Sequence, residues 1–244
     1  MLRKGHYRVR TAETQDDLTA AQRLRHLAFL GGQGDGLDRD EFDPVCTHFL
    51  VEDEATETLV CCFRLLPLDG GDEIDRSYSA QFYELSALAE FDGPIVEMGR
   101  FCIQPDARDP DILRAAWAAM TRYVDENGVE LLFGCSSFKG TDSDAYLDAF
   151  AMLKEKHLAP RRWLPRVKAP SVFNFAQKLR WFKPDAKQAM MAMPPLLRTY
   201  LVMGGWVSDH AVVDRQMNTL HVFTGLEINA IPPARKRLLR AVAG

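Results

Sequence analysis

A glutamate and an arginine stand three positions apart in the apolar run IVEMGRFCI, residues 95–103. The sequence around Glu97 and Arg100 contains neither a metal-binding motif nor an activated nucleophile, so the chemistry they offer is proton transfer and orientation of a charged group. Burial in an apolar strand makes a carboxylate a stronger base. Glu97 is therefore the candidate catalytic base, acting directly or through water, and Arg100 would orient a substrate carboxylate or Glu97. The alternative is a structural ion pair of Glu97 with Arg100 or Arg64.

The spacing of the two residues sets a geometric requirement. Because side chains of a strand alternate between its faces, Glu97 and Arg100 would point to opposite sides of a regular strand. We expect a bulge at Gly99 that turns them toward the same side.

The segments before this strand predict a helix and a hairpin. Residues 19–30 have the pattern of a helix, and the glycine- and aspartate-rich residues 31–43 follow it as a polar loop. The β-rich runs at 46–53 and 57–68, separated by an acidic turn, indicate a hairpin.

The segments after the strand predict a crossover unit. Asp109 as N-cap and Pro110 at the first helical position start a helix that ends at Asn127-Gly128. The run VELLFGCSSF (129–138) is a strand ending at Gly134, and Thr141 or Asp142 caps a second helix that runs to about Lys156. A strand, helix and strand in this order place a ligand at the turn QPDARD (104–109).

The composition indicates a soluble globular protein, with 47% hydrophobic and 26% charged residues in a chain of 244. We expect one domain over residues 1–244, in which about 160–244 form a basic C-terminal extension. No run approaches the roughly 18 apolar residues that span a bilayer. The five cysteines form no CxxC pair, which favours reduced thiols in the cytoplasm and argues against a structural zinc site.

The charge is distributed unevenly along the chain. Residues 1–150 carry 14 Lys and Arg against 29 Asp and Glu, whereas residues 151–244 carry 16 against 5, net charges of −15 and +11. This asymmetry predicts an anionic partner for the last part of the chain: nucleic acid, a membrane surface or an acidic protein. A basic face solvated by water and by the acidic half of the chain is the alternative.

The order of these parts resembles the GNAT acyltransferase superfamily, and within it two branches that use acyl carrier protein. The acyl-homoserine-lactone synthases carry a helical Arg and Phe, an Asp-x-x-Asp loop, an Arg after the hairpin and a Glu-x-x-Arg strand. The matching positions here are Arg25, Phe29, Asp40, Asp43, Arg64, Glu97 and Arg100. The loop tryptophan of those synthases has no counterpart in residues 31–43, which argues against signalling-lactone synthesis.

The chain is more similar to the ornithine acyl-ACP N-acyltransferases, which make lyso-ornithine lipid. The resemblance covers nearly the whole chain and is carried by FDPVCTHFLV (42–51), FRLLP (63–67), EMGRFCI (97–103), LFGCSSFKGTD (132–142) and PPLLRTYLVMGGWVSDHAVVDRQMNTLHV (194–222). The last stretch is the most specific, because homoserine-lactone synthases lack it. The family tends to have Lys at Arg198 and a more acidic segment at 214–222. These departures leave the identity of the acceptor amino acid undecided, since relatives that acylate glutamine instead of ornithine would have much the same sequence pattern.

The resemblance implies an α/β GNAT-like fold, with a mixed central sheet flanked by helices, and a defined reaction. A fatty acyl group, 3-hydroxylated, would pass from acyl carrier protein to the α-amine of L-ornithine, with no resident cofactor and no metal. Glu97 and Arg100 would be catalytic. The substrate-binding residues would be Arg25, Phe29, Asp40, Asp43 and Arg64. For Asp40 and Asp43, capping of the loop is an equal alternative.

The donor is expected to be a carrier-bound phosphopantetheine arm. The turn QPDARD lacks the glycines of the pyrophosphate loop in acetyl-CoA-using members, so its backbone cannot approach a pyrophosphate as closely. Arg108, Ser136 and Ser137 are candidate contacts to the arm, although a solvated arginine is an equal interpretation of Arg108. Cys135 is interpreted as a buried thiol, because GxSxG is absent.

The expected partners are acyl carrier protein, an amino acid and an anionic membrane touched peripherally at its inner face; no nucleic acid is expected. Two basic clusters are candidates for this docking: 161–168, with three arginines and a lysine, and ARKRLLRAV (234–242). The aromatic and methionine residues at 181–197 would line an acyl tunnel, face lipid or pack in the core. A non-catalytic module that binds nucleic acid or anionic lipid is the rival reading, but such a module has little use for Glu97 in a strand.

Overall fold

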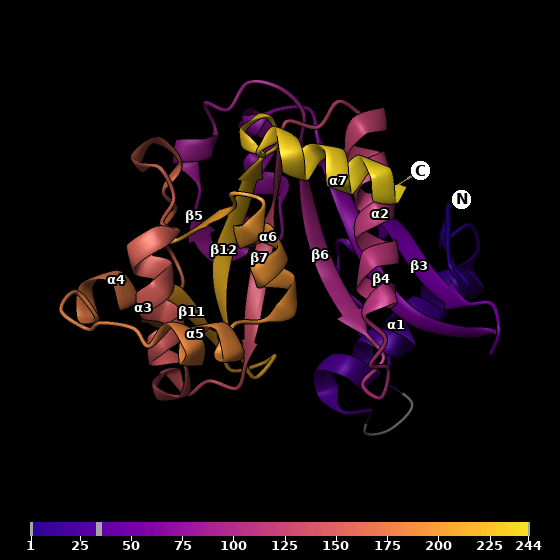
Figure 1. Ribbon diagram of the computed structural model, residues 1–244, viewed down its shortest axis with the longest axis horizontal. Helices are drawn as coiled ribbons and strands as arrows, with labels where there is room; N and C mark the ends of the chain where they lie inside the picture. Colours follow the sequence, from indigo (N-terminus) through magenta and orange to yellow (C-terminus); the bar gives the residue numbers. More distant parts are fainter. Residues whose placement is uncertain (1, 33–35, 244) are drawn as a thin grey trace. The chain divides into compact units, whose positions relative to one another are not determined.

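The computed structural model describes residues 2–32 and 36–243 (Figure 1). The chain divides into two compact units, each assembled from separate segments. Unit 1 comprises Met1–Pro67, Met98–Val129 and Pro233–Gly244, and unit 2 comprises Leu68–Glu97 and Glu130–Pro232. Both units contain helices on β-strands, which confirms the predicted α/β class. The single domain stays a prediction.

Unit 1 is a sheet with helices on both faces. Its strands follow the order β1 (Leu2–Lys4), β2 (Tyr7–Thr11), β3 (Thr47–Asp53), β4 (Thr58–Leu68) and the part of β6 (Ile95–Ile103) that begins at Met98. The first four are antiparallel, so the predicted hairpin is confirmed as β3 and β4.

Opposite sides of β3 anchor the two large helices of unit 1. On α1 (Gln15–Leu30), Ala21 and Leu24 pack with Leu50 of β3. The ring of Tyr123, on α2 (Pro110–Glu126), meets Phe49 with centroids 5.9 Å apart. Because adjacent residues of a strand point to opposite faces, α1 and α2 cover opposite faces of this sheet. The C-terminal helix α7 (Pro233–Ala243) crosses α2 and packs against it (Figure 1).

The early helix α1 begins four residues before its predicted start. Thr14 caps it, with its side-chain oxygen accepting from the Asp17 N–H at 3.1 Å while the Asp17 carboxylate accepts from the Thr14 N–H at 3.2 Å. This reciprocal capping box satisfies two backbone donors at the helix start. Gly31 ends the helix at φ +73°, a left-handed conformation that glycine adopts at little cost.

The crossover was predicted correctly at its start. The strand β6 covers the predicted residues, and α2 begins at Pro110 with Asp109 as N-cap. The next strand, β7 (Leu131–Lys139), pairs in parallel with β6 from Ile95 to Glu97.

The predicted end of β7 at Gly134 was wrong. The strand continues to Lys139, because β12 (Thr219–Glu227) pairs antiparallel with it along its whole length. A distant partner strand thus overrides the local glycine signal. The following predicted helix is a 3-10 turn, η5 (Ser143–Tyr146), capped by Asp142, and then α3 (Leu147–Lys156).

Unit 2 is built on a second set of strands. The order is the first part of β6, then β7, β12, β11 (Ala211–Asp214) and β9 (Val172–Phe173), with β10 (Trp206–Val207) also paired to β12. A separate pair joins β5 (Tyr83–Glu84) to β8 (Arg166–Val167). The helices α4 (Phe175–Lys178) and α5 (Ala186–Ala192) pack on α3 (Figure 1), and α6 (Pro195–Val202) contacts β12.

The core of unit 2 includes residues from the predicted C-terminal extension. Phe150 and Leu153 of α3 are fully buried with Phe175, Leu197 and Val222, which all come from the region predicted as an extension. Residues 160–232 therefore form part of the body of unit 2, and residues from 233 on belong to unit 1. Within the described part of the chain, no helix is long and apolar enough to cross a membrane.

Candidate active site

In unit 2, Glu97 is a buried carboxylate held by hydrogen bonds. The residue is 4% exposed and ends the ladder between β6 and β7, where it lies opposite Phe133. Its Oε2 accepts from the backbone N–H of Tyr78 at 2.7 Å, and its Oε1 accepts from the N–H and hydroxyl of Ser79 at 2.8 and 2.5 Å. Three donors fix the orientation of the group and stabilise its charged form. Glu97 is thus a buried carboxylate of fixed orientation.

Two further groups of unit 2 lie around this carboxylate. The Ser79 hydroxyl is 3.4 Å from the sulfur of Cys135 on β7, which is half-buried. Burial, together with the charge of Glu97, raises the pKa of Tyr200 on α6, so its phenol stays protonated at neutral pH. The polar groups near Glu97 therefore come from the short helix η3 (Ser79–Gln81), from β7 and from α6.

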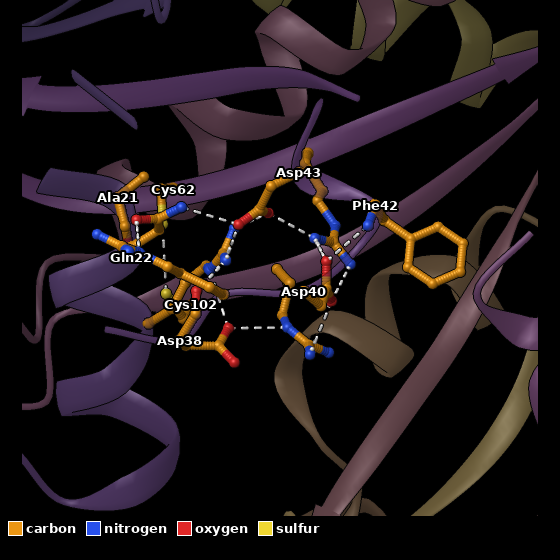
Figure 2. A network of polar contacts seen from close by, with 12 residues as sticks. Ala21, Gln22, Asp38, Asp40, Phe42, Asp43, Cys62 and Cys102 are labelled. Carbon is orange, nitrogen blue, oxygen red and sulfur yellow. Dashed lines mark hydrogen bonds and ion pairs between the residues drawn. The ribbon is translucent and has the colours of Figure 1, made fainter. Parts of the chain in front are cut away.

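In unit 1, three arginines meet three aspartates of one loop (Figure 2). The innermost is Arg25 of α1, 1% exposed. Its Nε donates to Asp38 at 2.9 Å, its Nη1 and Nη2 donate to the two oxygens of Asp43 at 2.8 and 2.9 Å, and Nη2 also donates to the Asp38 carbonyl. Gln22, one turn earlier, donates to Asp43 at 2.9 Å.

The outer part of this network uses the two strand arginines. Arg64 of β4 donates to both oxygens of Asp40 at 2.5 and 2.7 Å and to Asp43 at 2.6 Å. Arg100 of β6 donates to Asp38 at 2.9 Å and pairs with Asp40 at 3.0 Å. The side chains of Arg100 and Asp40 are 12% and 17% exposed, against 1% and 5% for Arg25 and Asp43. Solvent therefore reaches the Arg100–Asp40 end of the network.

The arginines keep the aspartates ionised. Burial alone would raise the pKa of Asp43, but the hydrogen bonds and charge of Arg25 outweigh it and hold that pKa well below its usual range. For Asp40, burial is likewise outweighed by Arg64, and its pKa is lowered. Burial lowers the pKa of His48, a buried histidine whose Nε2 lies 3.0 Å from the Asp43 carbonyl oxygen.

The irregular backbone predicted at Gly99 occurs one residue later. Arg100 has φ +51°, in the left-handed region that residues with a Cβ rarely adopt. Backbone strain of this kind costs about 1–3 kcal/mol and persists where surrounding contacts over-determine it. The two aspartates bound by the Arg100 guanidinium supply such contacts.

The remaining predicted site residues lie in separate places. Phe29 packs against the cluster of α1 and the unit 1 sheet. Arg108 is exposed and donates back to the carbonyl oxygens of its own turn, Pro105 and Ala107. Ser136 is buried and accepts from Thr224 at 2.9 Å, whereas Ser137 is exposed. The structure thus brings Arg25, Asp40, Asp43, Arg64 and Arg100 together, but puts Ser136 and Ser137 on opposite faces of β7.

Sequence reasoning missed the residues that hold Glu97. Tyr78 and Ser79 lie in a segment of short 3-10 turns between residues 71 and 88, which has neither helical nor strand periodicity. Asp38 and Gln22 were also missed; Asp38 could have been found because it lies in the aspartate-rich loop that supplied Asp40 and Asp43. Among the residues placed by the structure, no group of three or more His, Cys, Asp or Glu is arranged to hold a metal ion.

Known proteins resemble this chain in sequence and in fold. A family model described as "Acetyltransferase (GNAT) domain" matches residues 24–118. The L-ornithine N(alpha)-acyltransferase of Rhodobacter capsulatus is 35% identical over 239 residues, covering 92% of this chain and 91% of that protein. The enzyme of the same name from Brucella abortus is 28% identical, covering 94% and 87%.

A solved structure resembles the chain over most of its length. FeeM, an N-acyl amino acid synthase from uncultured soil microbes, aligns with a TM-score of 0.53 at 12% identity and covers 94% of both chains. At this identity the likeness concerns the fold.

The α/β fold and the family match identify residues 24–118 as a GNAT-type acetyltransferase domain. The similarity to the Rhodobacter capsulatus enzyme extends over nearly the full length of both proteins. The chain belongs to the L-ornithine N(alpha)-acyltransferase family.

Proposed function

We propose that this enzyme transfers a 3-hydroxyacyl group from acyl carrier protein to the α-amine of L-ornithine and so forms lyso-ornithine lipid. The observation that carries the proposal is the Glu97 carboxylate, which is buried and fixed by three hydrogen bonds. The names of the relatives from Rhodobacter capsulatus and Brucella abortus support ornithine as the acceptor.

In the proposed reaction, the neutral α-amine attacks the thioester carbonyl, and a C–N bond replaces the C–S bond. Glu97 accepts the proton that the amine loses, directly or through water, and the proton finally protonates the departing phosphopantetheine thiolate. Tyr200, whose phenol is kept protonated, is a candidate relay in the last step: it would donate its proton to the thiolate and take up the proton held by Glu97. Atoms and charges balance with ornithine and the acyl thioester as the only reactants.

The Arg100–Asp40 end of the unit 1 network fits the charges of the amino acid. Arg100 would bind the ornithine carboxylate, and Asp40, kept ionised by Arg64, would bind the side-chain ammonium. The more deeply buried Arg25 and Asp43 would instead hold the loop of residues 38–43. In this assignment Arg64 positions Asp40, and Phe29 supports the helix.

The carrier-bound donor is supported by the start of α2. A helix N-terminus attracts phosphate groups, but here the Asp109 carboxylate already accepts from the Asp111 N–H at 2.8 Å and from the Tyr7 hydroxyl at 2.9 Å. Burial and this hydrogen bond raise the pKa of Tyr7 to about 12, so the contact persists at neutral pH. A carboxylate at this position disfavours the pyrophosphate of coenzyme A. Arg108 and the two serines of β7 stay candidates for contacts to the phosphopantetheine arm.

Reconstitution with purified components tests the proposal. The enzyme is incubated with 3-hydroxyacyl carrier protein and either L-ornithine or L-glutamine, and the products are identified by mass spectrometry. We expect N-acylornithine, and a much lower kcat/KM with the matching acyl-CoA. Acylglutamine as the main product would reject ornithine, and equal kcat/KM for both donors would reject the carrier-specific donor.

The variant Glu97→Gln tests the catalytic base. Glutamine keeps the size of the side chain but cannot accept a proton, so kcat should fall by about 10²-fold or more. The amide has one oxygen in place of two, so at least one of the groups that donate to Glu97 loses its acceptor. Thermal unfolding is therefore measured as well, to verify that the variant folds. Full activity in a folded variant would assign Glu97 to structure.

A further inference from the structure

A tryptophan is displayed on the surface of unit 2. Trp181 is 83% exposed in the turn between α4 and α5, and Phe182 beside it is 36% exposed. Large aromatic rings usually bury most of their area, and aromatic residues that stay exposed together often mark an interaction site.

The turn that carries Trp181 is held in place. The Nζ of Lys154, on α3, donates to the carbonyl oxygens of Leu179 at 2.7 Å and Phe182 at 3.3 Å. The Phe182 N–H donates to the Leu179 carbonyl at 2.9 Å, and the Leu179 side chain is buried in the core of unit 2. Because the backbone on both sides of Trp181 is anchored, the exposure of the ring is a property of the fold.

The next helix adds apolar groups to the same stretch. On α5, Ala189 is buried and Met193 just beyond the helix is 1% exposed, so this side faces the core. Lys187, Met190 and Met191 have helical spacing i, i+3 and i+4 and face outward, with Met190 42% and Met191 70% exposed. Methionine is flexible and adapts to irregular apolar partners.

The stretch is also basic. Residues 178–191 contain four basic side chains, all exposed, against one acidic residue, Asp185. The Asp185 carboxylate accepts from the N–H groups of Lys187 and Gln188 and thereby caps α5. The guanidinium carbon of Arg180 lies 5.2 Å from the centre of the Trp181 ring, so charge and aromatic surface are presented side by side.

We propose that this surface binds the face of an anionic lipid bilayer. It is called the Trp181 surface below and consists of Lys178, Arg180, Trp181, Phe182, Lys183, Lys187, Met190 and Met191. Tryptophan prefers the boundary between headgroups and acyl chains, and lysine and arginine reach lipid phosphates from the same depth. The aromatic and methionine groups supply shallow apolar insertion, and the cations supply attraction to negative charge.

A lipid partner is favoured over an acidic protein because of the product. An amino acid carrying a long acyl chain is an amphiphile and partitions into a bilayer, a step of the argument that rests on the proposed function. Contact between enzyme and bilayer would shorten the path of the product.

Vesicle co-sedimentation of the full-length protein tests the inference without substrate or turnover. The probes are vesicles of phosphatidylcholine and vesicles that contain about 30% phosphatidylglycerol, a typical anionic surface. The variants are Trp181→Ser with Met191→Ser, and Lys183→Glu with Lys187→Glu. The matched control is Arg235→Glu with Arg237→Glu, the same charge change on exposed arginines of α7. Thermal unfolding verifies that each variant folds.

We expect binding to the anionic vesicles, weaker binding to phosphatidylcholine, and a loss of roughly tenfold or more in each Trp181-surface variant. The control should change binding by less than about twofold, since its cations lie outside this surface. Equal loss in the control, or unchanged binding in both variants, would overturn the proposal. A higher KM for acyl carrier protein with unchanged vesicle binding would assign the surface to the acidic protein instead. Because binding is measured without turnover, failure to acylate ornithine would be a separate result.

Discussion

Glu97 is held differently from the aspartates of the 38–43 loop. Two backbone N–H groups and one hydroxyl donate to its carboxylate, whereas guanidinium groups donate to the aspartates. Neutral donors orient a carboxylate without cancelling its charge, which suits a group that must accept a proton. The glutamate was predicted from the sequence because it interrupts an apolar strand. Its donors were not, because Tyr78 and Ser79 reach it only through tertiary structure.

Removing the Ser79 hydroxyl should leave Glu97 less well oriented, without abolishing its action as a base. In Ser79→Ala the carboxylate keeps the two backbone donors, so we expect kcat to fall by about tenfold, less than in Glu97→Gln. Fewer donors stabilise the ionised carboxylate less, so the acid limb of the kcat/KM profile should move to higher pH. Steady-state rates from pH 5 to 9 would measure both effects.

A second buried serine of unit 2 serves as the control. The hydroxyl of Ser208 donates to the His210 carbonyl at 2.7 Å and has no part in the proposed site. Ser208→Ala should lower stability to a similar extent and leave the acid limb in place. If both variants shift the limb equally, or neither does, Ser79 has no specific role in positioning Glu97.

At the scale of elements, local signals predicted the boundaries that local contacts determine. Asp109 and Pro110 start α2 through contacts within one turn, and Gly31 ends α1. The end of β7 was missed because it depends on β12, about 90 residues away in sequence. The arginine and aspartate positions were predicted from the family resemblance, but single residues could not reveal that they bind one another. The loop of residues 38–43 is joined to α1, β4 and β6 by those ion pairs.

Breaking the inner pair of this network should destabilise unit 1. Asp43→Asn leaves the buried Arg25 guanidinium with reduced compensation, and we expect a loss of about 3–5 kcal/mol in the free energy of unfolding. Urea denaturation measures it. The exposed pair of Arg240 and Asp125 provides the comparison, since Asp125→Asn should cost less than about 1 kcal/mol. A similar small loss for both variants would contradict the role of the network in holding the loop.

Acid should destabilise the same unit. Asp17, Asp40, Asp43 and Glu52 all have a pKa held below its ordinary value, with Arg10, Arg64 and Arg25 as the main partners. A lowered pKa in the folded state stabilises the protein above the unfolded value, near 4, and this stabilisation is lost as the pH falls further. Thermal unfolding between pH 7 and pH 3 should show a decline that begins below about pH 4.5 and is shallower in Asp43→Asn. A constant melting temperature over this range would contradict the expectation.

At the scale of the whole molecule, the residues up to 150 are acidic and those after 150 are basic. The basic part belongs to both units, with residues 151–232 in unit 2 and the rest in unit 1. Some of its cations are already paired: Arg162 with Glu227 at 3.2 Å, Arg166 with Glu84 at 3.6 Å, and Arg240 with Asp125 at 2.9 Å. Glu227 is already counted in the net charge of +11 over residues 151–244, but Glu84 and Asp125 lie outside that range, so their two pairs lower the charge available to a partner below +11. Composition predicted the sign of that charge correctly, but pairing depends on which acidic side chains the fold brings near.

The exposed cations that are left should steer the acidic carrier protein. Attraction between charges on two proteins is screened over about 10 Å at roughly 0.1 M salt, whereas the chemical step proceeds inside the assembled complex. Raising the salt concentration from roughly 0.05 to 0.3 M should therefore increase the KM for acyl carrier protein severalfold and change kcat little. The KM for acyl carrier protein is measured after charge reversal at Arg161 and after charge reversal at Arg235 and Arg237. The reversal that raises this KM more identifies the cluster that steers the carrier protein. If neither charge reversal raises the KM for acyl carrier protein and salt does not change it either, the basic residues are solvent-exposed charges with no role in docking. Electrostatic steering has to weaken when its charges are reversed and when salt screens them.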